Sequence, residues 1–230
     1  HGGSAYDGRA MSGWEWTALI AACLGVAVPL WTAWAMRWGA TRSERRASMP
    51  GDAYFEAPRR ARVTMTRAVS IAAPPDRVWP WLAQLGRGAG WYSYDRLDNG
   101  GRTSAEHIVS WIPAPAHGDA APIGYIRGLS TGRQITWWLP GLTFLGAHTR
   151  LVTDIQLRAQ DSGSRLVIRM AADASGMLAW PALWVFCVMD NIMATRQLRA
   201  FAPASRRMAH ATWTPHGPRP VRAISSSPTR

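Results

Sequence analysis

The sequence predicts an α+β fold in which an antiparallel sheet packs against a long C-terminal helix, preceded by one membrane-spanning helix. Three observations lead to this expectation. The segment from Trp16 to Met36 runs 21 residues without a charge. Several segments between residues 64 and 170 alternate in side-chain character with the period of a strand. An apolar stripe at helical spacing follows, ending at Phe201. The chain of 230 residues is 47% apolar, which suits one globular domain with added segments and excludes an intrinsically disordered protein.

The first expected element is the membrane helix. At about 1.5 Å rise per residue, the uncharged segment forms a helix roughly 30 Å long, the thickness of a bilayer core. Indole rings favour the headgroup layer, and four of them stand near its ends: Trp14, Trp16, Trp34 and Trp38. We therefore assign residues 1–13 to an N-terminal flank and 14–38 to a transmembrane helix. The alternative, a buried core helix, rarely runs this far without a charge.

Charge predicts the orientation of this helix. Four arginines lie in residues 37–46, whereas a chain that starts at Met11 carries only Glu15 before the span. The positive-inside rule then predicts a single-pass protein of the inner (cytoplasmic) membrane with its C-terminal domain in the cytoplasm. A cleaved signal peptide is the alternative, with Ala33-Trp34-Ala35 as the cleavage site, but its N-terminal region is only weakly basic.

A basic linker is expected over residues 39–62, and a strand over 64–71. In that strand Met65, Arg67, Val69 and Ile71 share one face. Two prolines at 74 and 75 end the strand and begin a helix over residues 75–85. A glycine-rich turn follows at residues 86–90. We expect a short helix to begin at residue 104, and a loop over 113–122 because that stretch is rich in proline, alanine and glycine.

Strands are then expected over 123–127, 135–139, 151–157 and 166–170, the last two joined by a hairpin at Asp161–Ser164. The final helix begins in the apolar run 177–189 and continues to Phe201. It is the only element long enough to cover the sheet, and a curved sheet would leave a cavity beneath it. The segment 203–230 is expected to be a disordered basic tail.

One stretch identifies a resemblance to a known superfamily. Residues 66–86, TRAVSIAAPPDRVWPWLAQLG, closely resemble the opening of SRPBCC (START-like, polyketide cyclase/dehydrase) proteins. Residues 50–52, 90–95 and 189–198 fit a bacterial subgroup of that superfamily, and the resemblance covers roughly residues 50–202. It implies the helix-grip fold for a domain over 63–202, with an apolar pocket. Members bind lipids, sterols, polyketides or quinones, and a minority are enzymes. The membrane helix lies outside the resemblance.

Candidate ligand-binding residues follow from this expectation. We expect aromatic side chains to line the pocket: Trp79, Trp91, Tyr92, Tyr94, Trp111, Trp137 and Phe144. Trp137 and Trp138 must face opposite sides of their strand, so one lines the pocket and the other meets a helix, a partner or the bilayer. Arg67 has two open interpretations. Its face looks outward onto the linker, or its guanidinium reaches the pocket and pairs with an anionic headgroup.

Catalytic and metal sites receive little support from the sequence. No histidine stands at metal-ligand spacing, and we predict no metal, no cofactor and no catalytic residue. Cys23 and Cys187 are interpreted as packing residues. The glycine-rich turn at 86–90 lacks the Lys-Ser/Thr of a nucleotide loop, so a plain turn is favoured over a phosphate cradle. Tyr92, Tyr94 and Asp95 are interpreted as structural, with acid–base chemistry as the alternative.

The net charge of +12 raises the question of nucleic-acid binding. Seven arginines but no acidic residue follow Asp190, and no nucleic-acid-binding motif accompanies them, so we predict no nucleic-acid partner. The leading hypothesis is a membrane-tethered domain that binds an apolar ligand (a lipid, quinone, pigment or polyketide) at the cytoplasmic membrane face. The alternatives are a non-catalytic accessory subunit of a membrane complex and a cyclase/dehydrase-type enzyme. The expected partners are thus the bilayer, an apolar small molecule and other membrane subunits.

Overall fold

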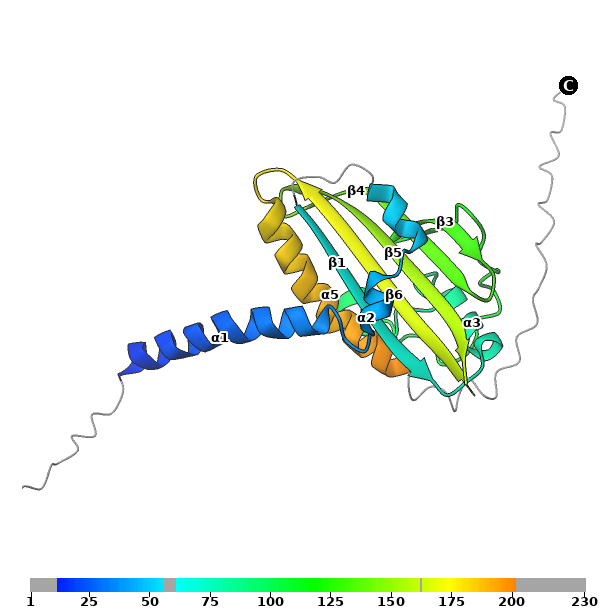
Figure 1. Ribbon diagram of the computed structural model, residues 1–230, viewed down its shortest axis with the longest axis horizontal. Helices are drawn as coiled ribbons and strands as arrows, with labels where there is room; N and C mark the ends of the chain where they lie inside the picture. The colour runs from blue at the N-terminus through cyan, green and yellow to red at the C-terminus, as the bar shows by residue number, and fades with distance from the viewer. Residues whose placement is uncertain (1–11, 56–60, 162, 202–230) are drawn as a thin grey trace, which may run out of the picture.

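The computed structural model describes residues 12–55, 61–161 and 163–201 (Figure 1). The N-terminal part contains the helix α1 (Gly13–Ala35), the short helix α2 (Arg42–Arg46) and the 3₁₀ helix η1 (Pro50–Phe55). The domain that follows consists of β1 (Ala61–Ile71), α3 (Pro75–Gln84), α4 (Asp95–Asp98), β2 (Ala120–Ala121), β3 (Gly124–Ser130), β4 (Gln134–Phe144), β5 (Ala147–Gln160), β6 (Gly163–Ser175) and α5 (Ala179–Phe201). The predicted tail at 203–230 lies outside the described residues.

The strands form one antiparallel sheet in the order β1-β6-β5-β4-β3-β2. Strands β2 to β6 follow one another as a meander, and β1 pairs with β6 at the far edge. Register shifts in β3 at Ile126/Gly128 and in β4 at Leu139/Leu142 bend the sheet. The long helix α5 crosses one face of the curved sheet (Figure 1). The predicted helix-grip α+β fold is thus confirmed.

The main core lies between the inner face of the sheet, α3 and the C-terminal end of α5. Val69 and Ile71 of β1 share one face, as predicted, and this face points inward, where they pack with Trp79 of α3 and with Leu198 and Phe201 of α5. A second cluster lies at the other end of α5, around Ala182 and Leu183. Between the two clusters, the middle of α5 and the sheet enclose the cavity described below.

The segment predicted as a linker packs closely on the outer face of the sheet up to residue 55. Phe55 of η1 is buried against Val152 and Ala171, and Trp138 packs on Tyr54 and Phe55. The guanidinium of Arg169 organises this segment, since it donates to the carbonyls at 44, 45 and 47 and pairs with Asp52 at 2.9 Å. The outward tryptophan thus meets η1, one of the elements of its own chain.

Helix α1 projects away from the domain (Figure 1). It is long and apolar enough to cross a membrane, and only 11% of its most hydrophobic window is buried against the described chain. Its contact with the domain is at its last turn, where Thr32 and Ala35 are buried. Immediately after it, the carbonyls of Met36 and Trp38 accept hydrogen bonds from the amides of Thr66 and Ala68, which fixes the chain to the free edge of β1.

Two local predictions were wrong. No helix begins at Ser104, because its hydroxyl and amide both bond the carboxylate of Asp95, at 2.6 and 3.2 Å, and this holds the segment as a bend. A short helix, α4, begins at Asp95 instead. The region 113–122, predicted as loop throughout, ends in the two-residue strand β2, which pairs with the start of β3.

Candidate functional site

A cavity of about 270 Å³ lies between the sheet and the middle of α5. Its floor comes from the inner faces of β1, β5 and β6, and its roof from residues 190–197 of α5. The segments 91–98 and 122–123 close its sides. The floor residues are Arg67, Thr153, Ile155, Ile168 and Met170, and the roof residues are Asp190, Met193, Ala194 and Gln197. The walls are therefore mostly apolar, with a few polar groups.

The hollow arises from the residues that α5 presents at this point. The two clusters on either side of the cavity contain Leu183 and Leu198, whose branched side chains fill the space above the sheet. Between them stand Ala194, which has a single methyl group, and Met193, which is unbranched and flexible. The small side chain at 194 leaves room that a leucine would occupy.

Arg67 enters the cavity wall, which settles the question left open by the sequence. Its guanidinium is 1% exposed and pairs with the carboxylate of Asp190 at 2.8 Å. It also donates to the side-chain oxygen of Asn191 and, through Nε at 3.0 Å, to the carbonyl of Ala35 at the end of α1. One of the two interpretations paired it with an anionic headgroup, whereas the observed partner is a carboxylate of the same chain.

This ion pair affects which charges the cavity accepts. A buried guanidinium and a buried carboxylate in contact cancel one another, and separating them would leave an uncompensated charge in an apolar environment. An anionic ligand would have to break the pair or remain unpaired beside it. The carboxylate of Asp98, which accepts a hydrogen bond from Ser93, also lines the cavity, so the wall carries one more negative than positive group and disfavours an anionic ligand.

Apart from Asp190, whose carboxylate pairs with Arg67, two residues of the cavity wall each have a buried polar atom without a hydrogen-bond partner among the described residues: Thr153, through its hydroxyl, and Asp98, through Oδ1. Such a group carries a desolvation cost unless a ligand or water satisfies it. The hydroxyl of Thr153 can donate to a carbonyl oxygen or accept from a hydroxyl, and it therefore offers an orienting contact for a ligand with one polar atom.

Of the predicted aromatic residues, Trp91 lines the cavity. Trp79 and Trp137 are buried in the adjoining core. Tyr92 fills the space between Trp81 and Phe201, with ring centroids 5.9 and 5.7 Å away, and its phenolic oxygen accepts a hydrogen bond from Gln84 at 2.6 Å. Burial raises the pKa of Tyr92 to about 12, so at neutral pH the phenol is a poor general base.

The other three predicted residues lie elsewhere. Tyr94 faces the groove described next. Trp111 is 67% exposed, with its ring over Gly88. Phe144 packs edge-on against Phe186, with centroids 6.5 Å apart, in the cluster at the start of α5.

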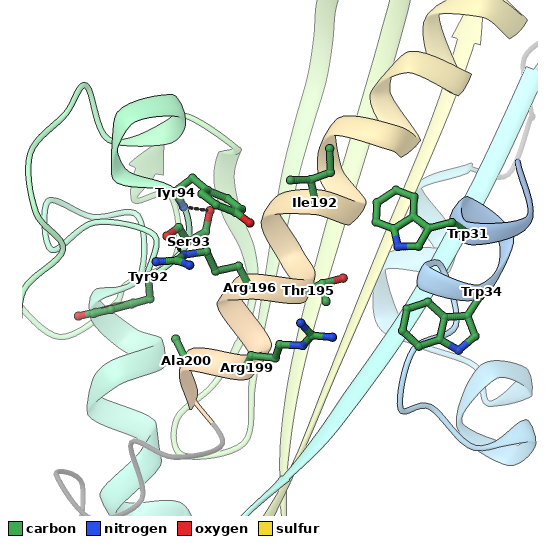
Figure 2. Close-up of a pocket in the computed structure, with 10 residues that line it drawn as sticks. All are labelled: Trp31, Trp34, Tyr92, Ser93, Tyr94, Ile192, Thr195, Arg196, Arg199 and Ala200. Carbon is green, nitrogen blue, oxygen red and sulfur yellow. Dashed lines mark hydrogen bonds between the residues drawn. The ribbon is translucent and has the colours of Figure 1, made fainter. Parts of the chain in front are cut away.

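A groove of about 580 Å³ lies between the last turns of α1 and the outer face of α5 (Figure 2). Trp31 and Trp34 form its α1 wall, and Ile192, Thr195, Arg196, Arg199 and Ala200 its α5 wall. Residues 92–94 close one end. Ser93 contributes to both the groove and the inner cavity, so a thin wall separates them.

The described residues give little support for a catalytic site, a metal site or a phosphate-binding turn. The thiol of Cys187 is buried, and its pKa is raised to about 11 by this burial and by Asp190. Asp95 is engaged by Ser104 rather than by a tyrosine. Within the described ranges no three His, Cys, Asp or Glu side chains are grouped to hold a metal ion. The glycine-rich turn is covered by rings, with Trp91 over Gly86 and Trp111 over Gly88, where a phosphate would have to approach.

The sequence missed most of the cavity's polar groups. Thr153 alternates with Leu151 and Ile155 on one face of the strand expected over 151–157, and this apolar face could have marked it as inward. Asp190 is the single acidic residue in α5, and an isolated carboxylate within an apolar helix is a recognisable sign of a buried pair. Met170, Met193, Ala194 and Gln197 carry no such signal, because their position depends on how α5 crosses the sheet.

No protein-family model matches the chain, and no curated protein matches it. The chain is similar to three solved structures among others. They are Ara h 8.0201 (14% identity, 64% of this chain and 99% of that one, TM-score 0.38), protein MLL2253 from Mesorhizobium loti (14%, 64% and 96%, 0.38) and protein Ms6760 from Mycobacterium smegmatis (14%, 66% and 93%, 0.36). These TM-scores are low, and the fold assignment rests on the strand order and helix packing of this chain.

Proposed function

We propose that this protein is a membrane-tethered binding domain for a small, uncharged, apolar molecule, held in the cavity between the sheet and α5. The observation that carries the proposal is the cavity itself: a hollow of about 270 Å³ with apolar walls and the unpartnered hydroxyl of Thr153. Small-molecule sites typically combine such walls with a few placed polar groups.

Volume and charge narrow the class of ligand. Ligand pockets commonly enclose roughly 300–1,000 Å³, so this cavity of about 270 Å³ lies just below that range. It suits a quinone ring, a short isoprenoid or a compact polyketide better than a diacyl lipid or a large pigment. The mostly apolar walls favour a molecule without formal charge, and the additional carboxylate of Asp98 disfavours an anion. A carbonyl or hydroxyl on the ligand would meet Thr153.

The tether gives this binding a location. Helix α1 provides the length and apolarity of a membrane span, with the four arginines of residues 37–46 beyond its C-terminal end. We propose that the domain stands at the cytoplasmic face. Apolar molecules concentrate in the bilayer, and a binding domain anchored beside it samples them at a high effective concentration. Even a modest affinity then suffices for exchange with the membrane.

Native mass spectrometry of the full chain, released from nanodiscs, tests the proposal. We expect a co-purifying small apolar molecule on the wild type. We also expect saturable quenching of tryptophan fluorescence by added 1,4-naphthoquinone, because Trp91 lines the cavity. Ala194→Phe fills the cavity and should abolish both signals. Ala159→Phe, at an exposed position of β5, is the matched control and should leave them unchanged.

The outcome that contradicts the proposal is equally definite. If the wild type carries no small molecule and quenching by naphthoquinone is unsaturable or indifferent to Ala194→Phe, the cavity does not bind ligands of this class.

A second candidate function, an accessory subunit of a membrane complex, is favoured by the outer face of α5. Large apolar side chains of α5 are exposed, namely Trp180, Trp184, Met189 and Ile192, and Met177 is exposed in the turn before the helix. This face is continuous with the groove beside α1, so the membrane helices of another subunit could contact both. A protein of fixed stoichiometry in the same mass spectra would support this candidate, and a chain that is always released alone would remove it.

A further inference from the structure

We propose that the groove between α1 and α5 binds the anionic headgroup of a membrane phospholipid. This site is separate from the inner cavity and has its own charge and lining. The inference rests on the membrane tether of the proposed function, but not on the ligand of the cavity.

Two arginines supply the positive charge. Arg196 and Arg199 lie one helical turn apart on α5, and both line the groove. Within the described residues neither has a carboxylate partner. Their observed contacts are neutral: Arg196 donates through Nε to the carbonyl of Ser93 at 2.8 Å and lies over the ring of Tyr94, and Arg199 lies 5.8 Å from the ring centre of Trp38.

These contacts orient the guanidinium groups without neutralising them. The neutral carbonyl and the aromatic faces leave the full positive charge available, in contrast to Arg67, which a carboxylate neutralises. Two uncompensated guanidinium groups within one groove attract an anionic phosphate, and the N–H donors of Arg199 have no hydrogen-bond partner among the described residues.

An unused hydroxyl adds a neutral donor. The side-chain oxygen of Thr195 is buried at this groove and has no hydrogen-bond partner among the described residues. Figure 2 shows Thr195 and Arg199 reaching from α5 towards α1, opposite Trp31 and Trp34. A phosphate oxygen beside Thr195 would satisfy this hydroxyl and lie near the guanidinium of Arg199, while Arg196, directed towards Ser93 and Tyr94, adds positive charge at the other end of the groove.

The opposite wall points to a lipid as the source of the phosphate. Trp31 is 36% exposed and Trp34 52%, and both stand in the last two turns of the apolar helix. Indole rings at the end of a membrane span lie at the level of the headgroups. The groove then opens where the glycerophosphate of a cytoplasmic-leaflet lipid lies, with apolar surface for the start of its chains and arginines for its charge. A free phosphate has no apolar part that could pack against Trp31 and Trp34.

The test uses the full chain in nanodiscs that contain equal amounts of phosphatidylglycerol and phosphatidylcholine. Native mass spectrometry then measures which lipid remains bound. We expect retention of phosphatidylglycerol over phosphatidylcholine. The double substitution Arg196→Gln/Arg199→Gln should lower this preference by about fivefold per arginine, the effect of one cationic contact at an anionic surface.

Matched controls separate a site from general attraction. Arg127→Gln/Arg158→Gln removes the same charge from exposed positions of the sheet and should leave the preference unchanged. Because Arg196 also holds Ser93, the single variants Arg199→Gln and Thr195→Val provide changes that leave that contact intact. Each should reduce the preference while the melting temperature stays within a few degrees of the wild type.

Three outcomes would overturn the inference. One is equal retention of both lipids by the wild type, and a second is equal loss in the groove and control variants. The third is binding of inorganic phosphate, titrated into phosphatidylcholine nanodiscs, that is as tight as the binding of phosphatidylglycerol. The phosphate group in the groove would then come from a free anion and not from a lipid. A chain that binds naphthoquinone but shows no lipid preference refutes this inference alone, whereas a chain that fails to enter nanodiscs refutes the tether and this inference together.

Discussion

At the scale of single residues, Arg67 shows how far a sequence pattern reaches. Alternation in β1 placed its side chain on the same face as Val69 and Ile71, and this face is indeed the inner one. The partner of the guanidinium was not predictable, because Asp190 lies more than a hundred residues away and meets it only once α5 has crossed the sheet. The alternation of residues along a strand predicts which face a side chain is on. It does not predict which side chain of another helix or strand it will contact, because that depends on how the elements pack.

The Arg67–Asp190 pair leads to a stability prediction. Arg67→Met leaves a buried carboxylate without its counter-charge, and breaking a buried pair in this way costs about 3–5 kcal/mol. We expect a large fall in the melting temperature of the detergent-solubilised chain, followed by near-UV circular dichroism. Arg67→Met/Asp190→Leu removes both charges and should recover much of the loss. If Arg67→Met is as stable as the wild type, the carboxylate of Asp190 does not need Arg67 as its counter-charge, and the prediction is wrong.

Cys187 provides a second test at this scale. Its pKa of about 11 leaves little thiolate at neutral pH, and the side chain is buried against the sheet. In a Cys23→Ala background we expect iodoacetamide to label Cys187 only after unfolding in guanidinium, as measured by mass spectrometry. Rapid labelling of the folded chain would mean that Cys187 is accessible and that α5 is not packed on the sheet at this position.

At the scale of elements, those with a strong local pattern were predicted well. The helix expected over 75–85 is α3 (Pro75–Gln84), and the strands expected over 151–157 and 166–170 lie within β5 and β6. The segment 39–55 has no periodic pattern of its own. Its course over the outer face of the sheet is set by distant partners, Arg169 and Asp154, so the sequence predicted only a basic linker there.

Gly51 tests how this segment is attached. Its amide donates to the buried carboxylate of Asp154 at 2.8 Å, and a Cβ at this position would collide with that carboxylate and with Val152. Gly51→Ala should therefore displace η1 and expose Trp138, which is visible as a red shift of tryptophan emission and a lower melting temperature. Ala53→Ser, in the same short helix, is the control. Unchanged emission in Gly51→Ala would contradict the close approach.

Acid should weaken the same attachment through Glu44. Hydrogen bonds from Arg165 lower the pKa of Glu44 from 4.5 to about 2. Because the folded pKa is the lower one, the contribution of the carboxylate is complete above pH 4.5 and is lost as the pH falls towards 2. We expect the difference in melting temperature between the wild type and Glu44→Gln to shrink over this window. A difference that is independent of pH would mean that the Arg165 contact is not formed.

At the scale of the whole molecule, the sequence predicted the architecture and the existence of a cavity, but not its lining. A curved antiparallel sheet with one long covering helix leaves a hollow for geometric reasons. Which side chains border the hollow depends on where α5 crosses, and of the eight residues proposed in advance only Arg67 and Trp91 line the cavity. Large aromatic residues such as Trp79 and Trp137 fill the core instead, since their burial contributes more when no space is left beside them.

The tether leads to a prediction for the molecule as a whole. If α1 spans the bilayer, the full chain should stay with the membrane pellet after extraction in alkaline carbonate and be released only by detergent. Its intact mass should include residues 14–38. Release by carbonate, or a mature mass that begins after Ala35, would show that the helix is a peripheral or cleaved segment.

The contact of Arg67 with the carbonyl of Ala35 has a wider consequence, because the same side chain borders the cavity. The end of α1 and the wall of the cavity are therefore held by one side chain. If α1 spans the bilayer as proposed, a ligand that draws Arg67 away from the carbonyl of Ala35 would change the angle between the membrane helix and the domain.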